Sequence, residues 1–152
     1  MLLLDEPFSA LDNSLRAEMR DLLRNLQQRL HLTTLFVTHD QAEAAALADR
    51  IALLLEGKLA QVGPPRDFYL SPLTPQVARF FGWKVVMGEL RNDKIETAIG
   101  SFPTPATACE GKCQLAFRPQ SLWLSEQGTV EGVIETVFDL GWVVHFRVRL
   151  AD

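Results

Sequence analysis

The sequence predicts an α/β domain with parallel strands, followed by a small all-β barrel domain. Over residues 1–48, short apolar runs alternate with segments of helical character, which indicates the first domain. Beyond residue 83, short β-prone segments are separated by Gly, Pro, Asn and Asp, which is typical of a small barrel or sandwich. We therefore expect two domains, over residues 1–82 and 83–152.

The first predicted strand and helix occupy residues 1–30. The run at 1–4 is wholly apolar and stops at charged residues, which predicts a strand buried on both faces, as in a parallel sheet. Residues 13–30 carry leucine and methionine at helical spacing with polar residues between them, which predicts an amphipathic helix. Asp12 is its predicted N-cap.

A second strand and helix follow at once. Residues 33–38 are rich in β-branched and apolar side chains and predict a strand. Asp40 and Glu43 then have the spacing of a capping box, which predicts a helix over residues 41–48. The succession strand, helix, strand, helix predicts a βαβ unit with parallel strands.

The next segment predicts a hairpin and two short helices. Residues 51–55 and 58–62 flank Glu56 and Gly57, a good two-residue turn. A short helix to Tyr69 and a helix over residues 74–81 follow, separated by proline. The β-prone segments of the second domain lie at residues 85–90, 95–99, 113–117, 130–138 and 143–150.

Composition restricts the class of protein. Lys and Arg number 15 against 19 Asp and Glu, so the basic face of a nucleic-acid binder is not expected. No apolar run approaches the roughly 20 residues of a membrane-spanning helix. The N-terminus also lacks the basic start of a signal peptide, so we expect a cytoplasmic protein. Cys109 and Cys113 are too few for a disulfide framework and are expected to be free thiols.

Two adjacent carboxylates, Asp5 and Glu6, end the first predicted strand. Ligands of open α/β sheets bind at the carboxyl edge of the strands. Carboxylates there suit a magnesium-nucleotide site, because one can hold a water on the cation and the other can polarise an attacking water. Taken alone, such a pair is more often a solvated loop, and a lone histidine after a strand is more often structural than catalytic.

Longer strings carry more information than these single residues. The string LLLDEPFSALD, residues 2–12, resembles the Walker B and D-loop motifs of ABC-family ATPases. The string LFVTHDQAEA, residues 35–44, resembles their switch histidine or H-loop region. The sequence is therefore identified as similar to the second part of the P-loop ATPase domain of an ABC transporter.

The resemblance implies ATP and Mg²⁺ as cofactors and a role for five residues. Asp5 would lie in the second shell of Mg²⁺, and Glu6 would be the general base for the hydrolytic water. His39 would hydrogen-bond the γ-phosphate. Ser9 and Asp12 would belong to the D-loop, which crosses the interface between two nucleotide-binding domains, and Asp12 can serve as an N-cap as well.

Later segments resemble importer-type members of the family. Residues 55–63 look like the hairpin after the H-loop, and residues 67–72 look like a helix of importer ATPases, although Pro64 replaces a residue with a capping hydroxyl. Residues 117–120, with Gly132 and Gly141, resemble the β-barrel regulatory domain called TOBE. That module is typical of importers of polyamines, ferric iron, oxyanions and sugars.

Two family motifs are not found in the sequence. A Walker A loop needs GxxxxGK followed by Ser or Thr, and neither Gly57-Lys58 nor Gly111-Lys112 fits that pattern. There is also no signature motif of the LSGGQ type. We therefore expect a fragment, with a partial TOBE-like domain, that is inactive alone because the phosphate cradle is not part of it.

The resemblance also implies partners. These are a second ATPase subunit in a homodimer, transmembrane permease subunits, and indirectly a periplasmic or lipid-anchored binding protein, at the inner face of the plasma membrane. One alternative is a non-catalytic remnant that acts as a regulatory or small-oxyanion-binding module. Another is a soluble ABC ATPase, such as a repair protein, which the β-rich second part and the negative net charge disfavour.

Overall fold

The computed structural model describes the whole chain except residues 105–109, 124, 126, 129 and 151–152. The chain divides into two compact units, Met1–Phe81 and Gly82–Asp152, which we call the N-terminal unit and the C-terminal unit. The N-terminal unit mixes helices and strands, and the described part of the C-terminal unit consists of strands and one short 3-10 helix. No helix within the described residues is long and apolar enough to cross a bilayer.

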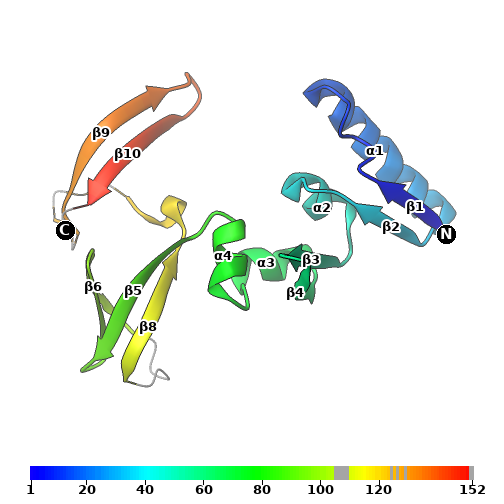
Figure 1. Ribbon diagram of the computed structural model, residues 1–152. Helices are drawn as coiled ribbons and strands as arrows, with labels where there is room; N and C mark the ends of the chain where they lie inside the picture. The colour runs from blue at the N-terminus through cyan, green and yellow to red at the C-terminus, as the bar shows by residue number, and fades with distance from the viewer. Residues whose placement is uncertain (105–109, 124, 126, 129, 151–152) are drawn as a thin grey trace. The chain divides into compact units, whose positions relative to one another are not determined.

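The N-terminal unit opens with a parallel βαβ arrangement, as predicted. Strand β1 (Leu2–Asp5) pairs in parallel with β2 (Thr34–Val37), and helix α1 (Asn13–Leu30) connects them (Figure 1). The prediction that the first strand is buried on both faces is wrong. Burial alternates along both strands, and Leu3 and Leu35 are 64% and 58% exposed, because the described residues cover only one face of this two-stranded sheet.

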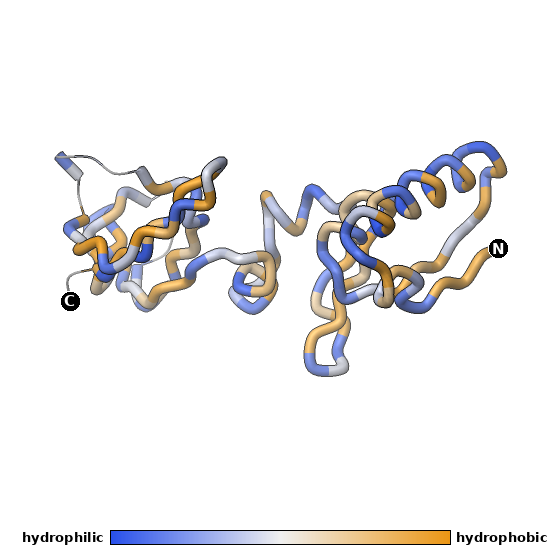
Figure 2. Tube along the Cα trace, turned by 90° about the horizontal axis from the view of Figure 1, so that it is seen from above, coloured by the Kyte–Doolittle hydropathy of each residue, from blue (hydrophilic) through white to orange (hydrophobic). Residues whose placement is uncertain are grey.

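Helix α1 has the predicted bounds because both of its ends are capped. At its start, Asp12 Oδ1 accepts a hydrogen bond from Leu15 N at 2.9 Å. At its end, His31 adopts the left-handed conformation at φ 49° and its N–H donates to Gln27 O. Between the caps, apolar and polar residues alternate along the helix (Figure 2). Leu23 is its buried residue.

We expect Asp12→Ala to destabilise the N-terminal unit by about 0.5–2 kcal/mol, because a helix N–H loses its acceptor. Asp12→Asn should lose much less, since asparagine caps about as well as aspartate. Urea unfolding followed by helical circular dichroism measures the difference. Equal losses for the two variants would contradict a capping role.

Helix α2 (Gln41–Leu47) is capped by Asp40, as predicted, but the capping box is only half formed. Asp40 Oδ1 accepts from the N–H groups of Ala42 at 2.7 Å and Glu43 at 3.1 Å. The reciprocal bond from the Asp40 N–H to Glu43, implied by the spacing, is not made. That N–H donates instead to Thr38 Oγ1 at 3.0 Å, and the Thr38 hydroxyl donates to Glu43 Oε2 at 2.6 Å.

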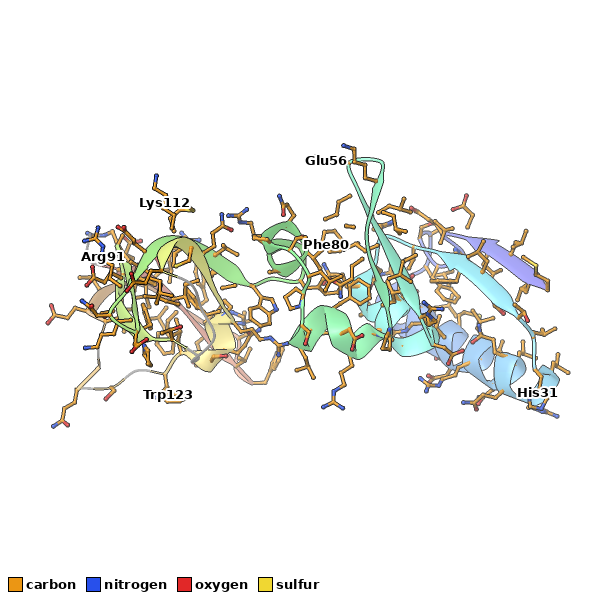
Figure 3. The ribbon with its side chains drawn as sticks, turned by 90° about the horizontal axis from the view of Figure 1, so that it is seen from below. His31, Glu56, Phe80, Arg91, Lys112 and Trp123 are labelled. Carbon is orange, nitrogen blue, oxygen red and sulfur yellow. The ribbon has the colours of Figure 1, made fainter. Side chains whose placement is uncertain are left out.

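A hairpin follows α2, with strands β3 (Ile51–Leu55) and β4 (Lys58–Gly63) paired antiparallel. Its turn is the predicted one: Glu56 and Gly57 have φ values of 51° and 73°, the pair of positive angles that a tight two-residue hairpin turn requires. Glu56 lies at the exposed tip of this hairpin (Figure 3). As expected from Pro64, the next helix has no side-chain cap.

The core of the N-terminal unit lies between the hairpin and two short helices, α3 (Pro65–Leu70) and α4 (Pro75–Phe80). Its buried members are Leu53, Phe68 and Val77. The rings of Phe68 and Phe81 lie 5.3 Å apart. One link between this core and α2 is a hydrogen bond from Gln41 Nε2 to Phe80 O at 2.9 Å.

In the C-terminal unit a four-stranded antiparallel sheet has the order β7-β6-β5-β8, and β9 pairs with β10 in a separate hairpin. The bounds are β5 Lys84–Arg91, β6 Lys94–Thr97, β7 Gly100–Pro103, β8 Gly111–Phe117, η1 Pro119–Ser121, β9 Gly132–Asp139 and β10 Val144–Leu150. The described strands do not close into a barrel, so the predicted barrel is not confirmed.

Individual residues of the C-terminal unit bear on the sequence predictions. A Cβ at Gly132 would lie 2.7 Å from Val148 Cγ1, and Gly141 has a φ of 83°, so a larger residue would be strained at either position. Cys113 is a free thiol, as expected, and Cys109 lies outside the described residues.

Candidate functional site

Parallel pairing places the predicted catalytic residues side by side. Asp5 is level with Val37 in the register of β1 and β2, so the two strands end together. The N–H of Glu6 donates to Val37 O at 2.9 Å, which fixes the first residue after β1 against the end of β2. His39, two residues beyond β2, then lies with its Nδ1 3.0 Å from Glu6 Oε1. Two residues 33 positions apart thus form one pair.

Glu6 has an unusual backbone conformation, which the sequence does not indicate. Its φ is 42°, in the left-handed region that residues with a Cβ seldom adopt and that costs on the order of 1–3 kcal/mol. The carbonyl of Glu6 accepts from the N–H and the hydroxyl of Ser9, at 3.2 and 2.9 Å. These bonds and the one to Val37 hold the strained residue in place.

The other predicted site residues lie in the same loop. Asp5 is exposed at the end of β1, Ser9 closes the turn on Glu6, and Asp12 caps α1. Between them, Phe8 is 6% exposed, and its ring lies 5.8 Å from that of Phe36. Phe8 thereby anchors this loop, residues 6–12, to β2. No contact joins the side chains of Asp5 or Asp12 to His39 in the described part of the site.

The pair has a defined electrostatic coupling. The hydrogen bond with Glu6 raises the pKa of His39, and the negative charge of Glu6 adds to that effect. Desolvation of the ring opposes this effect, and the charges of Glu43 and Asp40 add to it. Because an ionised Glu6 only accepts, Nδ1 of His39 is assigned as the donor. Both side chains are open to solvent, with 75% and 45% exposed.

We expect Glu6→Gln to lower the pKa of His39 toward the ordinary histidine value, because the charged partner is lost. A raised folded-state pKa means that the contact stabilises the fold fully below about pH 6.5, the unfolded pKa, and ceases to do so as pH rises through the folded pKa. Ring proton shifts of His39 followed against pH measure this. A higher or unaltered His39 pKa would contradict the coupling.

Three residues next to the pair form a charged network that the sequence did not reveal as such. Arg16 Nη1 lies 3.7 Å from Asp40 Oδ2, and Arg16 Nε lies 3.7 Å from Glu43 Oε1. Glu43 is only 3% exposed. These groups and the Glu6–His39 pair line one small cavity of about 40 Å³. Its lining residues are Glu6, Ser9, Arg16, Thr38, His39, Asp40 and Glu43.

Asp5 could act as one ligand of a metal ion, but the described side chains do not form a complete metal-binding site. Among the described residues no group of three or more His, Cys, Asp or Glu side chains could hold an ion. The exposed carboxylate of Asp5 has the donor chemistry that Mg²⁺ prefers. Mg²⁺ commonly keeps several waters and binds through one or two carboxylates together with substrate phosphates. The site therefore fits Mg²⁺ that arrives with a nucleotide.

Comparison with known proteins gives the chain curated relatives, although no protein-family model matches it. It is 38% identical over 152 residues to Fe(3+) ions import ATP-binding protein FbpC 1 of Rhodococcus jostii, covering 99% of this chain and 44% of the relative. It is 38% identical over 155 residues to sulfate/thiosulfate import ATP-binding protein CysA of Synechococcus elongatus, covering 100% and 42%. For spermidine/putrescine import ATP-binding protein PotA of Pseudomonas fluorescens, the identity is 41% over 162 residues, covering 99% and 45%. The chain thus spans less than half the length of each of these relatives.

Proposed function

We propose that this chain, which is homologous over its whole length to ATP-binding proteins of ABC importers, forms the part of such a subunit that activates water for ATP hydrolysis. The observation that supports this most directly is the 3.0 Å contact between Glu6 and His39 at the ends of two parallel strands. That edge is where open α/β sheets bind their ligands.

Glu6 is proposed as the general base. His39 contacts Oε1 of its carboxylate, and a carboxylate has a second oxygen that can accept a proton from water. Hydrogen bonds at its N–H and carbonyl position the residue without using the carboxylate. Phosphoryl transfer depends largely on positioning and charge stabilisation, so a fixed base with one open oxygen suits an attacking water.

His39 is proposed to bind the terminal phosphate. With Nδ1 directed at Glu6, its Nε2 is the ring nitrogen left to face a ligand. The raised pKa favours the protonated ring, in which Nε2 carries a hydrogen and can donate to a phosphate oxygen. The Glu6–His39 contact would thus orient the phosphate ligand and the base together.

ATP and Mg²⁺ are the cofactors that this function requires. Asp5 would hold Mg²⁺ through a water, and when bound the ion would neutralise charge on the phosphates. Ser9 and Asp12, in the loop that follows Glu6, are proposed to face a second ATPase subunit. The loop is anchored at Phe8 and at the N-cap of α1, so its residues have a fixed conformation from which to contact a partner.

The wider assembly is proposed from the relatives. They are named for the import of ferric ions, sulfate or thiosulfate, and spermidine or putrescine, so the cargo is proposed to be a small solute or ion of this kind. The partners would be a second copy of the subunit and transmembrane permease subunits, with a binding protein acting through the permease. The subunit would lie at the cytoplasmic face of the membrane. The C-terminal unit is proposed as a regulatory domain of the TOBE type.

A segment exchange tests the proposal. This chain would replace the matched segment of the Rhodococcus jostii ferric-ion relative, which is 38% identical to it. We expect the hybrid to bind ATP and to hydrolyse it with Mg²⁺, while the chain by itself hydrolyses none above a Glu6→Gln background. A hybrid that folds and binds ATP but has no hydrolysis would contradict the proposed role of this segment.

The alternative of an anion-binding module finds less support. An open hollow of about 440 Å³ in the C-terminal unit is lined in part by Arg91, which is labelled in Figure 3. Its lining includes two carboxylates, Glu89 and Glu110, against this one cation, and Arg91 pairs with Glu89 at 2.8 Å. An oxyanion there would meet net negative charge. Binding of molybdate, sulfate or phosphate in the absence of nucleotide binding would favour this alternative.

A further inference from the structure

We propose that Arg16 is a positioning residue, which holds the loop that carries His39 against the loop that follows Glu6. The roles of Glu6 and His39 in this inference rest on the proposed function. The contacts of Arg16 do not, and they connect three separate parts of the N-terminal unit: loop 6–12, helix α1 and the start of helix α2.

Arg16 first contacts loop 6–12. Its Nη2 donates to Leu11 O at 3.0 Å. The N–H of Leu11 in turn donates to the carbonyl of the buried Phe8 at 3.1 Å. The guanidinium therefore bonds to the end of a loop that is already anchored. Arg16 itself lies in the first turn of α1, where its N–H donates to Asp12 O.

The same guanidinium faces both acidic residues at the start of α2. Its Nη1 and Nε lie 3.7 Å from Asp40 and Glu43. The side chain of Glu43 is 5% exposed and that of Arg16 is 27% exposed, so solvent screens this pairing less than it would a surface ion pair. Glu43 also accepts the hydroxyl hydrogen of Thr38 at 2.6 Å.

These contacts bear on His39 because they secure the residues on both sides of it. Thr38 is bonded to Glu43, and Asp40 caps α2 while it faces Arg16. The residues directly before and after His39 are therefore both held by side-chain contacts. Its imidazole is largely exposed and contacts Glu6, so the direction of the ring depends on its fixed neighbours.

The position of Arg16, near the N-terminus of α1, is unfavourable for the stability of the helix. A cation near a helix N-terminus opposes the helix dipole, by about 0.3–1 kcal/mol at exposed positions. No acidic residue lies in the first turn of α1 to offset it. Besides the Asp12 cap, the carboxylates that offset this charge are Asp40 and Glu43, at the start of α2. A planar guanidinium has several N–H donors and can contact a carbonyl and two carboxylates at once. A lysine has a single charged nitrogen and cannot reproduce this arrangement.

The test is the pKa of His39 in the 152-residue chain carrying Arg16→Gln, measured from its ring proton shifts. Two effects of this substitution have opposite signs. Loss of a nearby positive charge alone would raise the pKa of His39, because the imidazolium meets less repulsion. Loss of positioning would separate His39 from Glu6 and lower it. We expect a fall that covers most of the difference between the wild type and Glu6→Gln.

Arg29→Gln is the matched control, because it removes the same charge from an exposed position in the last turn of α1. It should leave the His39 titration unaltered. If Arg16→Gln does not fold, the same measurement is made on Arg16→Lys. This variant keeps the charge but loses the contacts of the guanidinium, so it should also lower the pKa of His39. An unaltered or higher pKa in the deciding variant overturns the proposal. Failure of the segment-exchange hybrid to hydrolyse ATP would overturn the proposed function but leave this result standing.

Discussion

Glu6→Gln in the segment-exchange hybrid is expected to lower kcat for ATP hydrolysis by about 10²–10⁴-fold, the usual contribution of a positioned general base. The loss corresponds to about 3–5 kcal/mol of transition-state stabilisation. Glutamine has the size of glutamate but cannot accept the proton of the attacking water. ATP binding should persist, since Glu6 is proposed to contact the water and not the nucleotide. Steady-state hydrolysis and equilibrium nucleotide binding measure the two quantities separately.

Glu18→Gln supplies the matched control for this experiment. Glu18 is an exposed glutamate of α1, so its substitution removes the same charge outside the site. We expect it to leave kcat within a few-fold of the hybrid's value. If Glu6→Gln behaves in the same way as Glu18→Gln, Glu6 is not the base. If both ATP binding and kcat collapse in Glu6→Gln, the carboxylate has a structural role instead.

Phe68→Ala is expected to produce the largest loss of stability, about 3–5 kcal/mol for the N-terminal unit. Phe68 is 0% exposed and packs with Leu53 and Val77 in the core, with the ring of Phe81 5.3 Å away. Small domains are stable by only about 5–15 kcal/mol, so this variant should unfold at much lower urea concentration. Phe80→Ala, at a position 39% exposed, should lose less.

The two units can be followed separately in that measurement. All four α-helices of the described residues lie in the N-terminal unit, so helical circular dichroism reports its unfolding. The three tryptophans lie in the C-terminal unit, and they are Trp83, Trp123 and Trp142. Phe68→Ala should shift the circular dichroism transition and leave the fluorescence transition in place. A parallel shift of both transitions would show that the units do not unfold independently.

Local signals in the sequence predicted the helices and most strands. The bounds of α1 followed from an apolar repeat that starts at an N-cap, Asp12, and both determinants are local. Strand β7, at Gly100–Pro103, was not predicted, because glycine and proline are typical of turns. Its pairing with β6 is a tertiary contact. Proline is tolerated there because β7 is an edge strand of its sheet.

The candidate site was predictable only in part, for a similar reason. Glu6 and His39 were recognisable from strings of adjacent residues. The partners of Arg16 are a main-chain carbonyl and two carboxylates of another helix, so no spacing in the sequence connects them. One sequence feature was unusual: Arg16 is a basic residue in the first turn of a helix, where an acidic residue is favoured.

At position 6, the residue that would make the fold most stable differs from the residue that the proposed chemistry requires. A residue at φ 42° would be more stable as glycine, which adopts that angle without steric cost, but glycine has no carboxylate. Selection of variants for resistance to heat or proteolysis would therefore favour replacements that abolish the proposed base. Selection for transport would retain glutamate and its strain. Thermostable variants of such a subunit are best sought with position 6 held constant.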